Sequence, residues 1–143
     1  MYLTGAGGAI PRNAFAQMDQ HAELYYEEIR KRTSDVSAIV KNTKFSEEDI
    51  VKIKNHIFFN EYDFGEDVPT KFDPSYDMAV SWQRLIEGTN IQEMDLIMLR
   101  HELMEHQLMN DQGLAYHEAH EKTNMLYNYE KYTVELDRKE GLR

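Results

Sequence analysis

The sequence predicts an all-α protein, a compact bundle of five or six helices. Apolar residues recur at intervals of three and four over most of the chain, which is the periodicity of amphipathic helices. Serine, aspartate and glycine stand at the ends of these segments, where they cap and terminate helices. The stretch 60–74 breaks the pattern because it is rich in turn-forming and acidic residues. It has room for one short β-hairpin.

The length of 143 residues is that of one domain with its own core. Residues 1–12 contain three glycines and Pro11, so we expect a flexible lead there and a single helical domain over 13–143. The opening residues lack the features of a secretory signal, and no apolar run is long enough to cross a membrane. We therefore expect a soluble protein that does not insert into membranes.

Two helices are expected before residue 45. The first follows Asn13, a plausible N-cap, and reaches about Arg32. Its inner side is formed by Phe15, Met18, Ala22, Tyr25, Tyr26 and Ile29. A short helix at 36–41 follows the capping pair at 34–35. Both segments are typical of core helices.

Two further helices flank the stretch 60–74. Ser46 begins a capping-box-like sequence, and the inner stripe that follows it is Ile50, Val51, Ile53 and Ile57. Asp73 and Pro74 favour a helix start, since aspartate caps helices and proline fits their first position. The buried face of this helix is Met78, Ala79, Trp82, Leu85 and Ile86. Gly88 should end it.

The strongest candidate for a functional element is the helix expected at 95–109, with the sequence DLIMLRHELMEHQLM. At about 100° per residue, His101 and Glu105 fall about 40° apart on this helix, in a sector between Leu108 and Met98. Burying an imidazole and a carboxylate is costly unless they bind each other, a third group or a metal. The pair therefore marks a candidate site.

A third group is expected from the next helix, at 114–127. His120 shares its inner face with tyrosine side chains. Because the connection between the two helices is short, they should be antiparallel neighbours. We therefore expect His101, Glu105 and His120 to converge in the interior.

Four other residues are secondary candidates. His56 stands at the margin of an inner stripe, where a histidine is usually only partly buried. Asp63 and Asp67, in the stretch 60–74, could assist a metal or a substrate, although solvated loop acids are the simpler interpretation. Arg84 lies opposite the buried face of its helix. It could contact a substrate or partner, although an exposed arginine often serves only solubility.

Composition limits the chemistry. The chain has no cysteine, so a metal site would have to use nitrogen and oxygen ligands. The formal net charge of −10 repels phosphate backbones, which makes nucleic acid an unfavourable stable partner. A nuclease whose metal supplies local positive charge is still compatible with this composition.

Five segments taken together resemble a known family: KNHIF at 54–58, FDPSYDMAVSWQRL at 72–85, LRHELME at 99–105, YHEAH at 116–120 and YNY at 127–129. The family consists of small C-terminal domains of phage minor head proteins and of secreted polymorphic toxin-like proteins from Gram-positive bacteria. The similarity covers residues 13–132. It implies an effector or toxin-like module, cytoplasmic where it is made and then delivered by a phage or secreted. An immunity protein, or a phage head or delivery protein, would be its partner.

The helix at 95–109 is also similar to the zinc-peptidase pattern His-Glu-x-x-His, in which two histidines bind zinc and the glutamate activates water. The sequence departs from it because residue 105 is glutamate, giving His101-Glu102-x-x-Glu105. A tetrahedral site would use His101, Glu105 and His120 as ligands and water as the fourth. Glu102 would be the catalytic base, and Zn²⁺ or a similar divalent ion the cofactor.

Three hypotheses remain open for this cluster. The first is a metal-dependent hydrolase that cleaves peptide or phosphodiester bonds. The second is a metal-free nuclease in which His101 and His120 act as acid and base and Glu105 orients one of them. The third is a phage-encoded structural or interaction module, in which the same residues form a buried hydrogen-bonded cluster that fixes the register of the helices.

Overall fold

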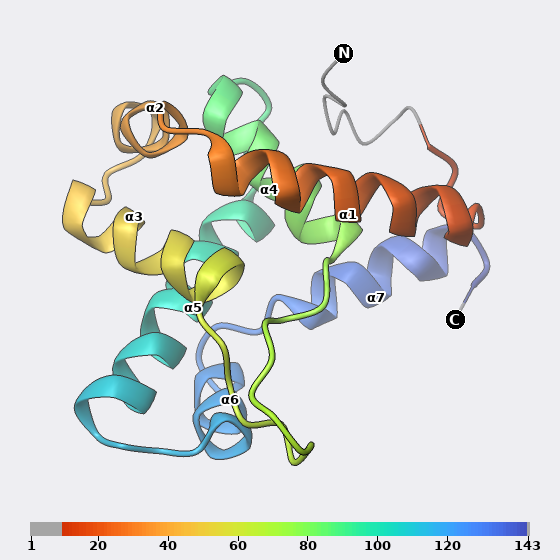
Figure 1. Cartoon of the computed structure of the whole chain (residues 1–143). Coiled ribbons are helices and arrows are strands. Elements are labelled where there is room, and N and C mark those ends of the chain that lie inside the picture. Colours follow the sequence, from red (N-terminus) through yellow and green to blue (C-terminus); the bar gives the residue numbers. More distant parts are fainter. Residues whose placement is uncertain (1–9, 143) are drawn as a thin grey trace.

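The computed structural model of the protein describes residues 10–142 and contains seven α-helices and one π-helical turn in that range (Figure 1). In chain order these are α1 (Phe15–Lys31), α2 (Asp35–Asn42), α3 (Glu47–Lys54), the π-helical turn η1 (Asn55–Phe59), α4 (Tyr76–Glu87), α5 (Glu93–Asp111), α6 (Tyr116–Asn124) and α7 (Glu130–Lys139). The described residues form no β-sheet. The prediction of an all-α fold is confirmed, and the helix beyond the expected five or six is α7, in the charged tail.

The hydrophobic core is built around α4, which packs against α1, α2 and α5. Trp82 of α4 is fully buried, and its ring meets Phe58 of η1 edge-to-face with the centroids 5.2 Å apart. Phe58 in turn meets Tyr26 of α1, with centroids 4.7 Å apart. Large aromatic rings bury much apolar surface and favour such edge-to-face contacts. This stack fixes η1 against the centre of the bundle.

A buried ion pair joins α2, α3 and α4. Asp35 is fully buried, and its two oxygens accept hydrogen bonds from Lys54 Nζ at 2.9 Å and from Trp82 Nε1 at 3.2 Å. Lys54 Nζ also donates to the carbonyl of Arg32 at 2.7 Å. Buried charges are tolerated where they are paired and hydrogen-bonded in this way. The pair holds the last residue of α3 in place directly before η1.

The helix boundaries differ in detail from those expected. α1 begins at Phe15 without a side-chain cap, whereas Asn13 is the expected N-cap. α4 begins one residue after Ser75, whose hydroxyl caps its first turn, and not at 73–74. Gly88 ends α4 as expected, with a φ of 76° that favours glycine.

Arg84 belongs to the framework of the fold. Its guanidinium donates to both oxygens of Asp95, at 2.8 and 2.7 Å, and Asp95 is fully buried. Asp95 also accepts from the backbone N–H of Gln92, in the capping box that begins α5. The expectation of an exposed Arg84 is therefore corrected. The sequence pattern misses this contact because the residue that recruits Arg84 is the capping residue of the next helix.

The stretch 60–74 folds back on itself beside α6 (Figure 1). Tyr62 and Thr70 form one antiparallel bridge, with N···O distances of 2.7 and 3.0 Å, so the expected hairpin is reduced to a single bridge. The rings of Phe64 and Phe72 pack against Tyr116 of α6, with centroids 4.9 and 5.4 Å apart. These contacts place an aromatic wall next to the inner histidines.

Residues 1–9 of the expected flexible lead lie outside the described residues, and its last part belongs to the fold. The guanidinium of Arg12 contacts Asp77 of α4 at 2.7 Å and Asp137 of α7 at 2.8 Å. α7 buries none of its residues, so its polar contacts matter for its position. Among the described helices, none has both the length and the apolar character needed to span a bilayer.

Candidate metal centre

The buried side of α5 carries ionisable residues where an apolar stripe would be usual. His101, Glu102 and Glu105 are 4, 7 and 1% exposed. The apolar Leu96 and Leu103, on another side of the helix, are only half-buried. α5 packs against α3, α4 and α6, so most of its circumference is covered. Glu102, which the helical pattern places at the edge of the buried surface, is therefore buried with the other two.

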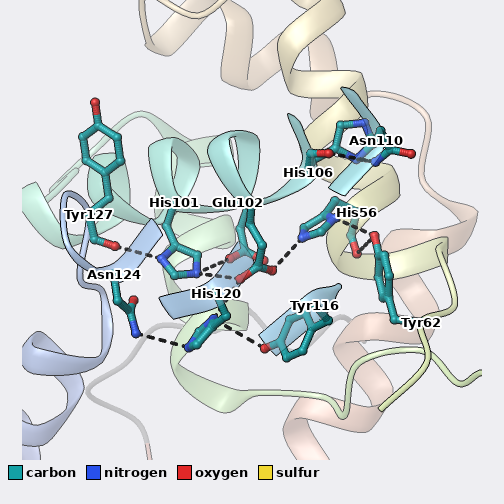
Figure 2. A network of polar contacts seen from close by, with 11 residues as sticks. His56, Tyr62, His101, Glu102, His106, Asn110, Tyr116, His120, Asn124 and Tyr127 are labelled. Atoms are coloured by element: carbon teal, nitrogen blue, oxygen red, sulfur yellow. Dashed lines mark hydrogen bonds and ion pairs between the residues drawn. The ribbon is translucent and has the colours of Figure 1, made fainter. Parts of the chain in front are cut away.

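Glu105 is the centre of this cluster, and three histidines from three helical elements surround it. Figure 2 labels these histidines, His56, His101 and His120, and draws their contacts as dashed lines. Its Oε2 lies 3.1 Å from Nε2 of His101 and 2.8 Å from Nδ1 of His120. Its Oε1 lies 2.8 Å from Nε2 of His56. The structure thus brings His101, Glu105 and His120 together, and it adds His56 to them.

His56 reaches the cluster because η1 is a π-helical turn. The backbone N–H of Asn60 bonds to the carbonyl of Asn55 at 2.8 Å, five residues earlier. This wider turn changes the helical register, so that His56, Ile57 and Phe58 are all buried. A regular helix would leave His56 at the margin of the stripe. The expectation of a partly buried His56 is corrected by its 0% exposure. The signal in the sequence is the apolar run directly after His56, which is too long for one face of an α-helix.

Two of the histidines are oriented by a contact on their other ring nitrogen. Nδ1 of His101 lies 2.8 Å from the carbonyl of Tyr127, and Nδ1 of His56 lies 2.5 Å from the hydroxyl of Tyr62. A carbonyl can only accept, so Nδ1 of His101 carries a proton and Nε2 is the atom directed at Glu105. Such outer contacts set the tautomer and orientation of metal-binding histidines.

His120 has a similar but incomplete arrangement. Its Nδ1 faces Glu105, and its Nε2 lies 3.2 Å from Nδ2 of Asn124. Oδ1 of Asn124 is buried and has no hydrogen-bond partner in the described part of the chain. Rotating this amide by half a turn would let Oδ1 accept from Nε2–H of His120. Both amide oxygen and imidazole would then be satisfied, with Nδ1 left to act as a ligand.

Glu102 differs from Glu105 in having no close partner. Its nearest basic atom is Nε2 of His101 at 3.5 Å, and it accepts no hydrogen bond from residues 10–142. A buried carboxylate without such a partner is costly to ionise. Binding a proton or a cation would therefore offset the cost of burying the Glu102 carboxyl group.

Burial and the local contacts shift the pKa values of the cluster in different directions. Burial alone would raise the pKa of Glu105, but hydrogen bonds from the three histidines outweigh it and hold that pKa well below its usual range. Burial opposes protonation of His101, yet its hydrogen bond to Glu105 and the charge of Glu102 raise its pKa to about 9. Burial and the neighbouring Glu105 raise the pKa of Glu102. Without a metal, the centre is an imidazolium–carboxylate pair beside a second carboxyl group.

The cluster borders a cavity of about 270 Å³. His101, Glu102, Glu105 and His120 line one part of it, and residues from α1, η1, α4, α6, α7 and the stretch 60–74 line the remainder. The cavity has room for water and for a small part of a substrate next to the ionisable groups.

Two groups of side chains in residues 10–142 are arranged so that they could hold a metal ion. One is His101, Glu105 and His120, and the other is His56, Glu102 and Glu105. Within each group the candidate ligand atoms lie within 4.8 Å of one another. Ligands about 2.0–2.2 Å from a common ion have comparable or smaller separations, so small side-chain movements would complete either site.

The remaining candidates lie away from this centre. Asp63 is exposed, and its carboxylate accepts from the backbone N–H of Gly65 at 2.9 Å, which stabilises a turn. Asp67 is also exposed. Arg84 is held by Asp95, as described above. Neither metal-binding group includes any of the three.

No protein family model matches this sequence, and neither a curated protein nor a solved structure shows significant similarity to it. The resemblance to phage and toxin-like domains therefore stays a prediction. The geometry of the centre is the basis for the proposals that follow.

Proposed function

We propose that the protein is a metal-dependent hydrolase in which His101, Glu105 and His120 hold a divalent ion. One observation carries this proposal: imidazole nitrogens from two different helices, α5 and α6, meet the same oxygen of Glu105, at 3.1 and 2.8 Å, beside a cavity. Two histidines and one glutamate, with an open fourth position, form a donor set found in catalytic zinc sites. Zn²⁺ is therefore the ion that we propose.

The outer contacts of these ligands support the same proposal. Tyr127 accepts from Nδ1 of His101, and Asn124 is placed to do so from Nε2 of His120 after rotation of its amide. Each ligand nitrogen thus points inward, while the opposite nitrogen is held from outside. A bound cation would also replace the proton that His101 otherwise shares with Glu105.

Glu102 is the residue best placed to move a proton in this reaction. The ion would lower the pKa of a water molecule bound to it and polarise the substrate. Glu102 faces the same cavity, and burial raises its pKa toward the range in which a carboxylate accepts a proton effectively. Peptide and phosphodiester bonds are both compatible with this arrangement.

The biological role that we propose is that of a phage-associated or secreted effector with toxin-like activity. Its support is the resemblance of segments such as LRHELME at 99–105 and YHEAH at 116–120 to that family. These segments carry the proposed ligands. An immunity protein, or a phage head or delivery protein, would be the corresponding partner.

Metal content and activity of the purified protein test the enzymatic proposal. We expect stoichiometric Zn²⁺ by mass spectrometry, together with hydrolysis of a peptide or nucleic-acid substrate that a chelator abolishes and Zn²⁺ restores. His120→Ala should weaken Zn²⁺ binding by more than the roughly 10–100-fold that loss of an outer partner costs. His117→Ala, at an exposed position of the same helix, is the matched control. A protein that binds no metal at all would overturn the proposal.

A second candidate is a non-catalytic module in which the cluster is purely structural. The observation in its favour is that Glu105 already accepts hydrogen bonds from three histidines, so most of the network is satisfied without a metal. This candidate predicts unchanged thermal stability in chelator and no hydrolysis. Hydrolysis that persists without metal and disappears in His101→Ala would instead support acid–base catalysis by the histidines.

A further inference from the structure

The two oxygens of Glu105 face two different sets of partners. Oε2 is directed at His101 and His120, whereas Oε1 is directed at His56. His56 thus stands on the other side of the same carboxylate, in a group with Glu102 that the proposed zinc site does not use. A carboxylate with ligands on both sides has the arrangement of a bridge between two ions.

The side chain of Glu102 is the second observation, and it is independent of the first. It is 7% exposed, it belongs to this group, and its nearest basic atom is Nε2 of His101 at 3.5 Å. The other buried carboxylates in the described chain, Asp35 and Asp95, each have a lysine or arginine partner. Two glutamates buried side by side are unfavourable because like charges at short range destabilise each other, and the imidazole of His101 is shared between them at 3.1 and 3.5 Å. A divalent ion between the two would remove this repulsion.

His56 is held as a ligand would be. Its ring is fully buried, its Nε2 points at Glu105, and its Nδ1 contacts the hydroxyl of Tyr62 at 2.5 Å. The π-helical turn that buries this ring is an unusual local structure, and such turns are frequent at functional sites. A core position alone would not require a polar ring here, since an apolar side chain would fill the same space without needing partners.

We infer that the centre binds two divalent cations, with Glu105 bridging them and with His56 and Glu102 as the further ligands of the second ion. This inference rests on the proposed function, because it adds an ion to the one held by His101, Glu105 and His120. Paired ions are used by many hydrolases to stabilise both the attacking and the leaving oxygen. Helical bundles also hold paired ions with glutamate and histidine from facing helices.

The second ion changes the role of Glu102. As a ligand, Glu102 positions the ion and does not act as the proton acceptor of a single-zinc site. The donor set of this second group, one imidazole and two carboxylates, is richer in oxygen than that of the first. Oxygen-rich sets accept Mn²⁺ as well as Zn²⁺. Both ions are therefore suitable probes.

Metal stoichiometry tests this inference. The full chain is stripped with chelator, loaded with Zn²⁺, desalted and analysed for metal per chain, with circular dichroism to verify folding. We expect two ions in the wild type and one in both His56→Ala and Glu102→Gln. His106→Ala is the matched control: the His106 ring lies 5.5 Å from that of His56 but belongs to neither group, so this variant should keep both ions.

The outcomes separate this inference from the proposed function. A wild type with one ion, unchanged in His56→Ala and lost in His120→Ala, would overturn the second site and leave the hydrolase proposal intact. A wild type without metal would overturn both. If the variants do not fold, Mn²⁺ loading of the wild type decides the matter by electron paramagnetic resonance. A spectrum of two coupled ions supports the inference, and only the six-line spectrum of isolated Mn²⁺ overturns it.

Discussion

Two buried acidic centres in this protein differ in the kind of partner that each carboxylate has. At one, Asp35 binds Lys54 and Trp82. At the other, Glu105 binds only histidines, and a cavity of about 270 Å³ lies against it. Lysine and arginine are permanent cations near neutral pH, whereas imidazole nitrogens exchange protons and bind metals.

The difference shows which buried charges hold the fold together and which are available for chemistry. At the first centre, the carboxylate of Asp35 and the ammonium of Lys54 are both paired and hydrogen-bonded. A ligand would gain no unsatisfied group there. The Glu105 cluster leaves one carboxylate, Glu102, and one amide oxygen, that of Asn124, without hydrogen-bond partners in the described chain. The carboxylates Asp35 and Glu105 are both almost completely buried, so burial of the acid does not separate the two centres, whereas the unsatisfied groups do.

The largest effect should come from breaking the Asp35 pair. Asp35→Ala would leave the ammonium of Lys54 buried without its carboxylate, which costs about 3–5 kcal/mol of unfolding free energy. Urea unfolding followed by circular dichroism measures this loss. Asp67→Ala, at an exposed acid, should change stability by less than about 0.5 kcal/mol. A loss at Asp35 as small as that of the control would show that the pair is not a structural anchor.

Zn²⁺ should stabilise the folded protein by binding at the Glu105 cluster and not at the Asp35 pair. Free Zn²⁺ at 100 times its dissociation constant should add about 2.7 kcal/mol to the unfolding free energy, and chelator should reverse the gain. The physical reason is that the converged ligands exist only in the folded state. The same increment should persist in any folded variant at Asp95 or Arg84, which lie outside the cluster. Thermal melts with and without Zn²⁺ measure this increment. An unchanged melting temperature would contradict metal binding at the Glu105 cluster.

Replacing Glu105 at the centre of the cluster should cost less than replacing Asp35. Glu105→Gln removes the shared acceptor, but His101 can then lose its extra proton, so we expect a loss of about 1–3 kcal/mol without metal. The zinc-dependent gain should disappear completely. Unfolding curves of this variant with and without Zn²⁺ measure both the metal-free loss and the zinc-dependent gain. A variant that keeps the gain would show that Glu105 is not a ligand.

The smallest effect has the opposite sign. Glu102→Gln removes a buried carboxylate without a hydrogen-bond partner and should stabilise the metal-free protein by about 1 kcal/mol. Because burial raises the pKa of Glu102, the folded chain holds this proton more tightly than the unfolded chain does. Ionisation therefore destabilises the wild type as the pH rises above 4.5, the ordinary value, and the advantage of the variant should grow in that direction. A destabilised variant in chelator would contradict this account.

The sequence predicts all three residues of the first candidate metal group because its geometry is local. His101 and Glu105 are one helical turn apart, and a short connection returns His120 to the same place. The periodicity of apolar residues likewise predicts the all-α fold, since six of the seven helices lie in segments where apolar residues recur at intervals of three and four.

The residues that sequence reasoning misplaced depend on contacts that periodicity does not encode. His56 is buried by a π-helical turn, and a regular helical repeat cannot describe that change of register. Arg84 is recruited by Asp95, whose position depends on the start of another helix. In each case the deciding partner is set by tertiary packing.

Arg12 connects two of the helices that line the cavity. It joins α4 to α7 through Asp77 and Asp137, and α7 supplies Glu130 and Thr133 to the cavity wall. Because no residue of α7 is fully buried, such polar contacts contribute to holding the helix in position. A protein docked on this corner, or a fusion that pulls on it, could therefore widen or narrow the entrance from a distance without touching a single ligand.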